Sequence, residues 1–248
     1  MITIKTQEEI QLMAESGKIL ATVLKEVEKM VKPGITTLEL DRASEALILS
    51  AGAKPGFKGY DGFPYSLCAS VNENIVHGLP SNYALKEGDI VGLDLGVIYK
   101  GYNSDMAVTV PVGNVSFEAK RLINVTKKSL RLGIKKAKVG NTIGDIGNTI
   151  QRFVEDQGFG VVRDLCGHGI GKNLHEDPKI PNFGKRGSGE KIEEGMVICI
   201  EPMVTVGDYN MKQSKDGYGF ATKDGSLSAH FEHTIAITKK GARVLTEI

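Results

Sequence analysis

The sequence predicts an α+β fold built from two halves that repeat one order of elements. Strand patterns come in runs instead of alternating singly with helices, which favours an α+β fold over a doubly wound sheet. The order of two helices followed by strands occurs twice along the chain, although no residue-level repeat accompanies it. Nothing in the 248 residues resembles an interdomain linker, so we expect residues 1–248 to form one catalytic domain.

The first half begins with two capped helices. Thr6 followed by Glu9 matches a capping box, and apolar residues then recur at helical spacing until Pro33-Gly34 ends the pattern. Thr36 followed by Glu39 opens a second helix in the same way. The stretch that follows, rich in glycine and aromatic residues, is typical of a loop. The predicted loop covers residues 51–64, and strands are predicted over 66–71, 89–99 and 102–110, with a turn at Lys100-Gly101.

The second half repeats this order. Helices are predicted over 116–138 and 142–157, and Gly158 ends the second because glycine readily adopts the left-handed conformation found after helices. Strands are predicted over 161–165, 195–200, 203–206, 219–222 and 228–238.

The composition is that of an ordinary globular protein. A formal net charge of +1 gives no support for nucleic-acid binding. No apolar run approaches the roughly 20 residues that a membrane span needs, and Met1 to Lys5 lack the apolar segment of a secretory signal. The cysteines, Cys68, Cys166 and Cys199, form no CxxC pair, which argues against a disulfide framework and a zinc ribbon. We therefore expect a cytoplasmic protein with no membrane or nucleic-acid partner.

One of the five histidines has glycine on both sides. His168 lies in the segment Cys166–Gly171, and His175 follows it. Flanking glycines allow a second backbone or a ligand to approach closely, although a glycine-rich turn with an incidental histidine would have the same sequence. The seven-residue separation of His168 and His175 does not match the HExxH zinc pattern.

Four carboxylates occur in or beside segments with the composition of buried strands. Asp94 lies inside the apolar run 90–98, and Asp105 lies in the strand predicted to pair with it. Glu201 follows one apolar run and Glu232 precedes another. A lone buried carboxylate is costly unless it is paired or bound to a metal. Any one of them could be a strand-end residue or a salt-bridge partner, but the four together indicate a shared site.

Four carboxylates that meet at contact distance cannot all stay ionised unless cations offset their repulsion. Two divalent metal ions would do so. Carboxylates with one histidine and no thiolate suit manganese, iron(II) or cobalt at least as well as zinc. Such a pair of ions generates hydroxide near neutral pH and polarises a carbonyl, as amide hydrolysis requires. The residues therefore indicate a dinuclear metal hydrolase and leave its substrate open.

Five segments together resemble the type I methionine aminopeptidases, in their short bacterial form. In chain order they are Asn74–Pro80, the pair Asp94 and Asp105, Cys166–Gly171 with His175-Glu176, Ile200–Met203 and Glu232–Thr234. The match extends over nearly the whole chain, including the opening Ile-Lys-Thr segment. The resemblance implies the pita-bread fold, in which two pseudo-symmetric halves of curved, mostly antiparallel sheet are backed by helices.

The resemblance also implies the roles of individual residues. The implied metal ligands are Asp94, Asp105, His168, Glu201 and Glu232. His175 would stabilise the tetrahedral intermediate, His77 would lie near the scissile nitrogen, and Glu201 would also transfer the proton of the attacking hydroxide. The implied walls of an apolar pocket for methionine are Tyr60, Phe63, Cys68, Leu174 and Tyr218, with Phe57 close by. Gly96 stands where threonine is common in the family.

The implied activity is removal of the N-terminal methionine from nascent or newly deformylated polypeptides, with a small second residue preferred. A cytoplasmic monomer that contacts the ribosome transiently is expected. Two alternatives are a proline-directed aminopeptidase or prolidase on the same fold, which residues 101–105 also resemble, and a binding protein that has lost catalysis. The Asn74–Pro80 segment favours the methionine enzymes, and the five filled ligand positions argue against a binding protein.

Overall fold

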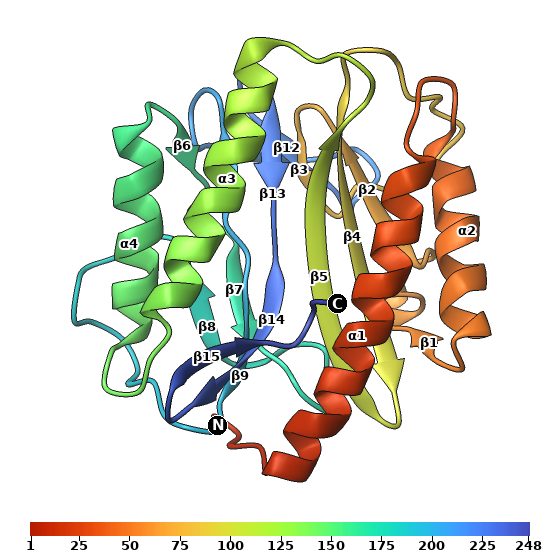
Figure 1. Cartoon of the computed structure of the whole chain (residues 1–248). Coiled ribbons are helices and arrows are strands. Elements are labelled where there is room, and N and C mark those ends of the chain that lie inside the picture. The colour runs from red at the N-terminus through yellow and green to blue at the C-terminus, as the bar shows by residue number, and fades with distance from the viewer.

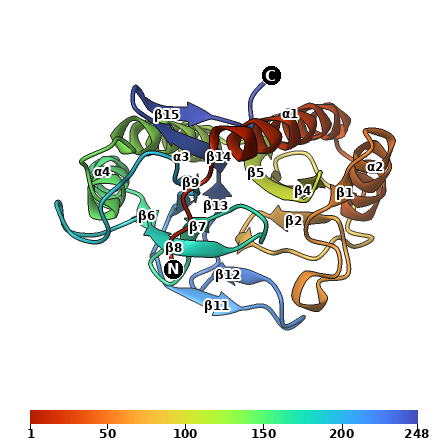
Figure 2. The same cartoon turned by 90° about the horizontal axis from the view of Figure 1, so that it is seen from below.

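Helices α1 and α3 lie side by side across one face of a set of antiparallel sheets in the computed structural model, which describes residues 1–248 (Figure 1). Seen from below, β8, β11 and β12 lie on the opposite face (Figure 2). All strand pairs are antiparallel. No helix combines the length and the apolar composition that crossing a membrane requires.

The first half contains two helices and a four-stranded sheet. The hydroxyls of Thr6 and Thr36 accept hydrogen bonds from the N3 backbone of each helix, and the carboxylates of Glu9 and Glu39 accept from the cap backbone. Both predicted capping boxes are thereby confirmed. The elements are α1 (Gln7–Met30), α2 (Thr37–Ser50), β1 (Lys54–Pro55), β2 (Leu67–Val71), β4 (Ile90–Tyr99) and β5 (Tyr102–Pro111).

Strand β4 has one face in the apolar core and its other face on the opposite side of this sheet. Leu93 and Leu95 belong to the apolar cluster that packs against α1 and α2. Successive side chains of a strand point to opposite faces, so Gly92, Asp94 and Gly96 face the other way. The strand is buried on both faces over most of its length, which explains why its sequence is nearly continuous in apolar residues.

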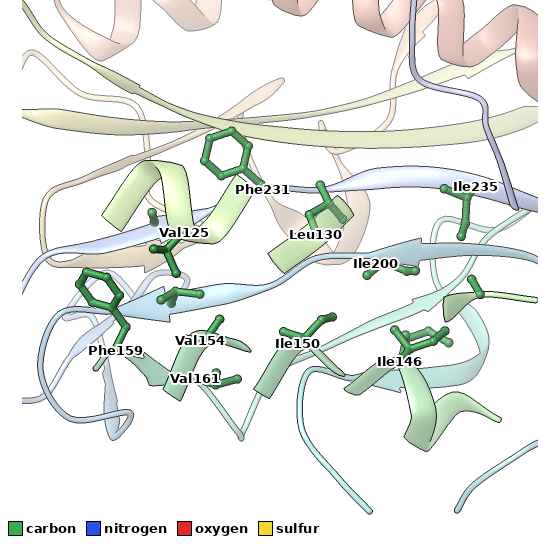
Figure 3. Packing of buried hydrophobic residues seen from close by; sticks show 14 of the residues in the cluster. Val125, Leu130, Ile146, Ile150, Val154, Phe159, Val161, Ile200, Phe231 and Ile235 are labelled. Atoms are coloured by element: carbon green, nitrogen blue, oxygen red, sulfur yellow. The ribbon is translucent and has the colours of Figure 1, made fainter. Parts of the chain in front are cut away.

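The second half repeats the arrangement with α3 and α4 on a five-stranded sheet, in the order β15-β14-β9-β7-β8. Its elements are α3 (Phe117–Lys136), α4 (Ile143–Asp156), β7 (Cys166–Gly169), β8 (Glu176–Pro181), β9 (Val197–Ile200), β14 (His233–Thr238) and β15 (Gly241–Val244). Ile150 of α4 and Leu130 of α3 pack in one cluster with Ile200 and Ile235 of the sheet (Figure 3). The predicted duplication of element order is confirmed.

Two three-stranded sheets, in the orders β13-β10-β6 and β11-β12-β3, complete the fold. Their strands are β3 (Asn74–Val76), β6 (Gly160–Val161), β10 (Met203–Thr205), β11 (Met211–Gln213), β12 (Phe220–Thr222) and β13 (Ser228–His230), and a short 3₁₀ helix, η1, spans Tyr60–Gly62. Pairing of β12 with β3 brings the segment around Tyr218 beside His77.

Two threonines join the halves where β5 faces β13 and β14. The Thr234 hydroxyl donates to the carbonyl of Asp105 at 2.8 Å and accepts from its N–H at 2.9 Å. Thr109 makes the same reciprocal pair with the backbone of His230. These hydrogen bonds fix Asp105 of the first half opposite the β13–β14 segment of the second half.

Several predicted boundaries were wrong. The predicted loop 51–64 contains β1, the predicted strand 161–165 ends at Val161, and the predicted strand 228–238 is two strands separated by Phe231 and Glu232. That break occurs because the Glu232 N–H donates to Ala107 of β5 at 2.9 Å instead of continuing its own ladder. The strands that were not predicted from the sequence are β1, β3, β7, β8, β11 and β15.

Candidate functional site

A single cavity of about 210 Å³ gathers all the site residues predicted from the sequence. It lies where the two halves meet, and its polar end carries Asp94, Asp105, His168, Glu201 and Glu232. The remaining predicted residues form its walls and its mouth: Tyr60, Phe63, Cys68, His77, Leu174, His175 and Tyr218. Phe57 and Asp61 complete the lining.

The pairing of β4 with β5 places the two aspartates together. Asp94 lies opposite Ala107, and Asp105 lies opposite Gly96, so the aspartates are diagonal neighbours on the same face. Cys68 of β2 lies opposite Asp94 and therefore shares that face. Burial, followed by the nearby carboxylates, raises the pKa of the Cys68 thiol well above its usual range, so it presents a neutral sulfur to the cavity.

The two glutamates leave their strands at breaks in the hydrogen-bond ladder. Glu201 directly follows β9, and its carbonyl accepts a hydrogen bond from the Asn182 side chain at 2.9 Å. Glu232 lies between β13 and β14. The sequence predicted Glu201 directly after the strand 195–200 and Glu232 within the strand 228–238. In the structure Glu201 directly follows β9 and Glu232 directly precedes β14, where the backbone turns each side chain toward the aspartates.

His168 depends on its flanking glycines. A Cβ on Gly167 would lie 2.3 Å from the Cys199 carbonyl oxygen, and one on Gly169 would lie 2.1 Å from that of Asp177. The neighbouring strands therefore approach β7 more closely than any side chain allows, as the glycines suggested. Burial, followed by the neighbouring His175, lowers the pKa of His168 to about 3, so the ring is neutral. Its Nδ1 lies 2.9 Å from the Gly169 carbonyl, which leaves Nε2 as the free nitrogen.

The donor atoms have the spacing of a metal site. His168 Nε2 lies 3.8 Å from Asp105, 3.7 Å from Glu201 and 3.9 Å from Glu232. Two donors bound at about 2.1 Å to one cation lie about 3–4 Å apart. Donor atoms of Asp94, Asp105 and Glu232 also lie within 4.8 Å of one another. The three buried carboxylate oxygens that lack hydrogen-bond partners in the chain all belong to these residues: Asp94 Oδ1, Asp105 Oδ1 and Glu232 Oε1. These residues fit divalent cations.

Electrostatics leads to the same conclusion. Burial and then mutual repulsion raise the pKa values of Asp105, Glu201 and Glu232 well above their usual range. Burial also raises the pKa of Asp94 to about 6, although His230 opposes the shift. Ionised carboxylates at this density are unfavourable without positive charge, and divalent cations would supply it.

Two further histidines lie at the mouth of the cavity. Tyr60 and His175 are in hydrogen-bond contact, with the hydroxyl 3.0 Å from Nδ1, and the His175 ring stands at 83° to His168 with centroids 4.4 Å apart. His77 is open to the cavity yet surrounded by protein atoms. That enclosure, followed by His230 and His175, lowers the pKa of His77 to about 4.

The opposite end of the cavity is apolar. The rings of Phe63 and Tyr218 meet edge to face at 5.7 Å, and the Tyr218 hydroxyl donates to the Gly62 carbonyl at 3.0 Å. The Phe57 ring packs against Gly96, and a Cβ on Gly96 would lie 2.6 Å from that ring. Gly96 therefore makes room for an aromatic wall.

His230 was not predicted from the sequence as a site residue. Its buried Nε2 has no hydrogen-bond partner in the chain and lies 3.5 Å from Glu201 and 3.9 Å from Glu232. The sequence feature that could have indicated it is its position two residues before Glu232. Alternate residues of an extended chain face the same side, so His230 and Glu232 can point into the same cavity.

A second, larger cavity of about 700 Å³ adjoins the first. The two cavities share His77, His168, His175 and Glu201. Leu165, Cys166 and Met203 line the larger one beyond these shared residues. The polar end of the small cavity thus opens into this larger groove.

Comparisons with known proteins agree with this geometry. The sequence model of metallopeptidase family M24 matches residues 11–239. A methionine aminopeptidase from Clostridium perfringens is 52% identical over 248 residues, which is 100% of both chains. The crystal structure of a methionine aminopeptidase from Thermotoga maritima superposes with a TM-score of 0.98 at 46% identity over 100% of both chains.

A prolidase from Pyrococcus furiosus is less similar. It superposes with a TM-score of 0.80 at 25% identity, and the match covers 99% of this chain and 65% of the prolidase.

Proposed function

The chain belongs to the methionine aminopeptidases of metallopeptidase family M24, and we propose that its cavity removes the N-terminal methionine of polypeptides with two bound divalent metal ions. The observation that carries this proposal is the group of buried, unpartnered carboxylate oxygens beside an apolar pocket. The prolidase match is lower in identity and in coverage, so the proline-directed alternative is not favoured.

The proposed ligands form two overlapping groups. Donor atoms of Asp94, Asp105 and Glu232 lie close together, and His168 lies near Asp105, Glu201 and Glu232. These five residues would hold the two ions. The oxygen-rich donor set supports manganese, iron(II) or cobalt at least as well as zinc. When bound, the ions supply a hydroxide nucleophile near neutral pH and polarise the scissile carbonyl.

The protein side chains position the substrate and move protons. Burial raises the pKa of Glu201, so its carboxylate readily accepts the proton of the nucleophile. His175, oriented by Tyr60, donates to the oxygen that becomes negative in the transition state. His77, which lines both cavities, contacts the departing nitrogen.

The two cavities bind different parts of the substrate. Phe57, Phe63, Leu174 and Tyr218 enclose the methionine side chain, whose flexible thioether adapts to an aromatic wall. The rest of the polypeptide leaves along the larger groove. The second residue passes between His77, His168, His175 and Glu201, so small second residues are preferred.

The proposed setting is the cytoplasm, with a monomer of one catalytic domain that contacts the ribosome transiently to meet nascent N-termini. The free thiols of Cys68, Cys166 and Cys199 suit a reducing compartment.

Glu201→Gln tests the proposed reaction. The change keeps the side-chain size but removes the proton acceptor, so turnover of Met-Ala-Ser should fall about 10²–10⁴-fold with an unchanged melting temperature. Released methionine is measured by chromatography, with Ala-Pro peptides and Met-Leu-Ser as comparison substrates. Near-normal turnover would remove the role of Glu201, and cleavage of Ala-Pro but not of Met-Ala-Ser would favour the proline-directed alternative.

Calorimetric titration of metal-stripped protein with manganese tests the ligand set. Wild type should bind two ions, and Asp94→Ala should lose tight binding of at least one. Identical uptake by both proteins would contradict the assignment.

A further inference from the structure

The net charge of the chain is close to zero, but its charged residues are unevenly distributed. Residues 117–138, which comprise α3 and its C-terminal end, contain eight lysines and arginines and one acidic residue, Glu118. Since the whole chain has a net charge of +1 and this segment has +7, the remainder has −6. The expectation of no nucleic-acid partner rested on the net charge alone.

Six of these cations form one stripe along α3. At 100° per residue they fall within about 120° of the helix circumference, whereas Glu118 lies outside this arc. All six side chains are exposed. We call these residues the basic stripe: Lys120, Arg121, Lys127, Lys128, Arg131 and Lys135.

The basic stripe lacks counter-charges. None of its six residues forms an ion pair, whereas Lys29, Lys58, Lys100 and Arg163 on other exposed surfaces do. Glu28 interacts with Lys127, but this carboxyl is half-buried, and burial raises its pKa. The positive charges of the stripe are therefore available to an external polyanion.

Aromatic side chains lie among these charges. Phe117 is 82% exposed at the start of α3. It borders a groove of about 430 Å³ together with Lys120, Arg121, Lys128 and Phe153. Lys128 Nζ lies 5.1 Å from the centre of the Phe153 ring. A cationic groove with an exposed aromatic ring is the combination that binds single-stranded nucleic acid, because phosphates meet the cations and a base stacks on the ring.

We propose that the basic stripe and Phe117 form a binding surface for single-stranded RNA. From Lys120 to Lys135 the stripe spans about 22 Å, enough for several consecutive phosphates. A membrane is a poorer partner, because the apolar face of α3, including Leu122 and Leu130, is buried in the core and cannot insert. Helix α3 lies on the helical face, away from β8, β11 and β12, so RNA bound to its exposed side leaves the proposed substrate groove open (Figure 2).

The test measures binding of a fluorescein-labelled 20-nucleotide oligouridine by anisotropy from 50 to 200 mM KCl. If six cations each neutralise a phosphate, the slope of log K against log salt is about −4, and affinity falls roughly 300-fold over this range. Lys128→Gln, Arg131→Gln and Lys135→Gln together should halve the slope to about −2, so that the fall is roughly 20-fold.

Controls separate this surface from general charge effects. Lys18→Gln, Lys32→Gln and Lys54→Gln together remove the same charge from exposed positions of the first half and should leave the slope unchanged. Phe117→Ala should weaken binding about tenfold at every salt concentration without changing the slope. Both triple variants should keep the wild-type turnover of Met-Ala-Ser, so the RNA surface and the peptidase site can fail independently.

Three outcomes would overturn the proposal: no binding of the oligouridine at 50 mM KCl, equal losses in the two triple variants, or tighter binding of the stripe to polyglutamate or to phosphatidylserine vesicles than to RNA.

Discussion

The buried imidazole of His230 lies within reach of two proposed metal ligands without being one of the predicted five. Burial lowers its pKa, so the ring is neutral beside Glu201, 3.5 Å away. A neutral imidazole next to a ligating carboxylate can donate a hydrogen bond that orients it. His230→Ala should therefore lower turnover of Met-Ala-Ser or metal affinity about 10–100-fold, measured by steady-state kinetics and by manganese titration.

A second buried histidine provides the control for this prediction. His233 follows Glu232, but its Nδ1 contacts the Thr246 hydroxyl at 2.9 Å, outside the cavity. His233→Ala should lower the melting temperature and leave the metal affinity of the folded protein intact. Equal losses of metal affinity in the two variants would mean that His230 acts only through packing.

Gly96 determines the shape of the proposed methionine pocket. A threonine there would place its Cβ 2.6 Å from the Phe57 ring and push the ring into the cavity. Gly96→Thr should raise KM for Met-Ala-Ser about tenfold, a typical effect of altered apolar pocket contacts, with two metal ions still bound. The measurements are kinetics and metal content. A double variant with Phe57→Cys should recover the affinity, and failure of both recovery and metal binding would contradict this account.

Whether a site residue could be predicted from the sequence depended on the free-energy cost of burying its side chain. Asp94 and Asp105 stand out because a buried acid is expensive in an apolar strand, and the structure places them together. The contact of Phe57 with Gly96 has no such signal, because it joins a loop to a strand about 40 residues away, and only the fold brings them together.

Strand β7 shows at the level of an element why glycine is required around His168. Its neighbours β8 and β9 leave no space for a side chain at Gly167. Gly167→Ala should destabilise the protein by about 1–3 kcal/mol through overpacking and weaken metal binding by displacing His168. Urea unfolding and calorimetric titration measure the two effects.

Gly92→Ala is the matched control for this change. Gly92 lies in β4 near Asp94, but a Cβ there would meet its nearest neighbour at an ordinary 3.5 Å. This variant should keep its stability within about 1 kcal/mol of wild type, since alanine reduces the entropy of the unfolded chain. A larger loss at Gly92 than at Gly167 would show that close approach is not the reason for glycine in β7.

Local sequence signals predicted some elements well and others poorly. The capped helices α1 and α2 and the hairpin of β4 and β5 begin and end within a few residues of the prediction, because capping boxes and a two-residue turn are local. Strand β8 contains two prolines in six residues and was missed. It lies at the edge of its sheet, where proline is tolerated, so tertiary position and not propensity defines it.

At the scale of the molecule, the predicted pita-bread fold is confirmed by the close match to the Thermotoga maritima structure. The residue patterns alone predicted that the order of two helices followed by strands occurs twice. They did not give the contact of β5 with β13 and β14, which depends on the hydroxyls of Thr109 and Thr234. Since the proposed ligand positions come from both halves, metal binding and the packing of the halves should be linked.

Metal removal should therefore make stability depend on pH in a defined direction. In the metal-free folded protein, burial raises the pKa values of Asp105, Glu201 and Glu232 well above their usual range and that of Asp94 to about 6. In the unfolded chain these groups ionise near pH 4. As pH rises from about 4 through the folded pKa values, the unfolded state loses protons first, so the metal-free protein becomes less stable.

With manganese the trend reverses, because the ions bind ionised carboxylates and stabilise only the folded state. Melting temperatures measured from pH 5 to pH 8, with manganese or with EDTA, should therefore diverge as pH rises. Glu232→Gln removes one titrating group at the centre of the cluster and should flatten the curve measured in EDTA. A metal-free protein that gains stability between pH 5 and pH 7 would show that these carboxylates are not buried together in solution, and the proposed metal site would lose its electrostatic basis.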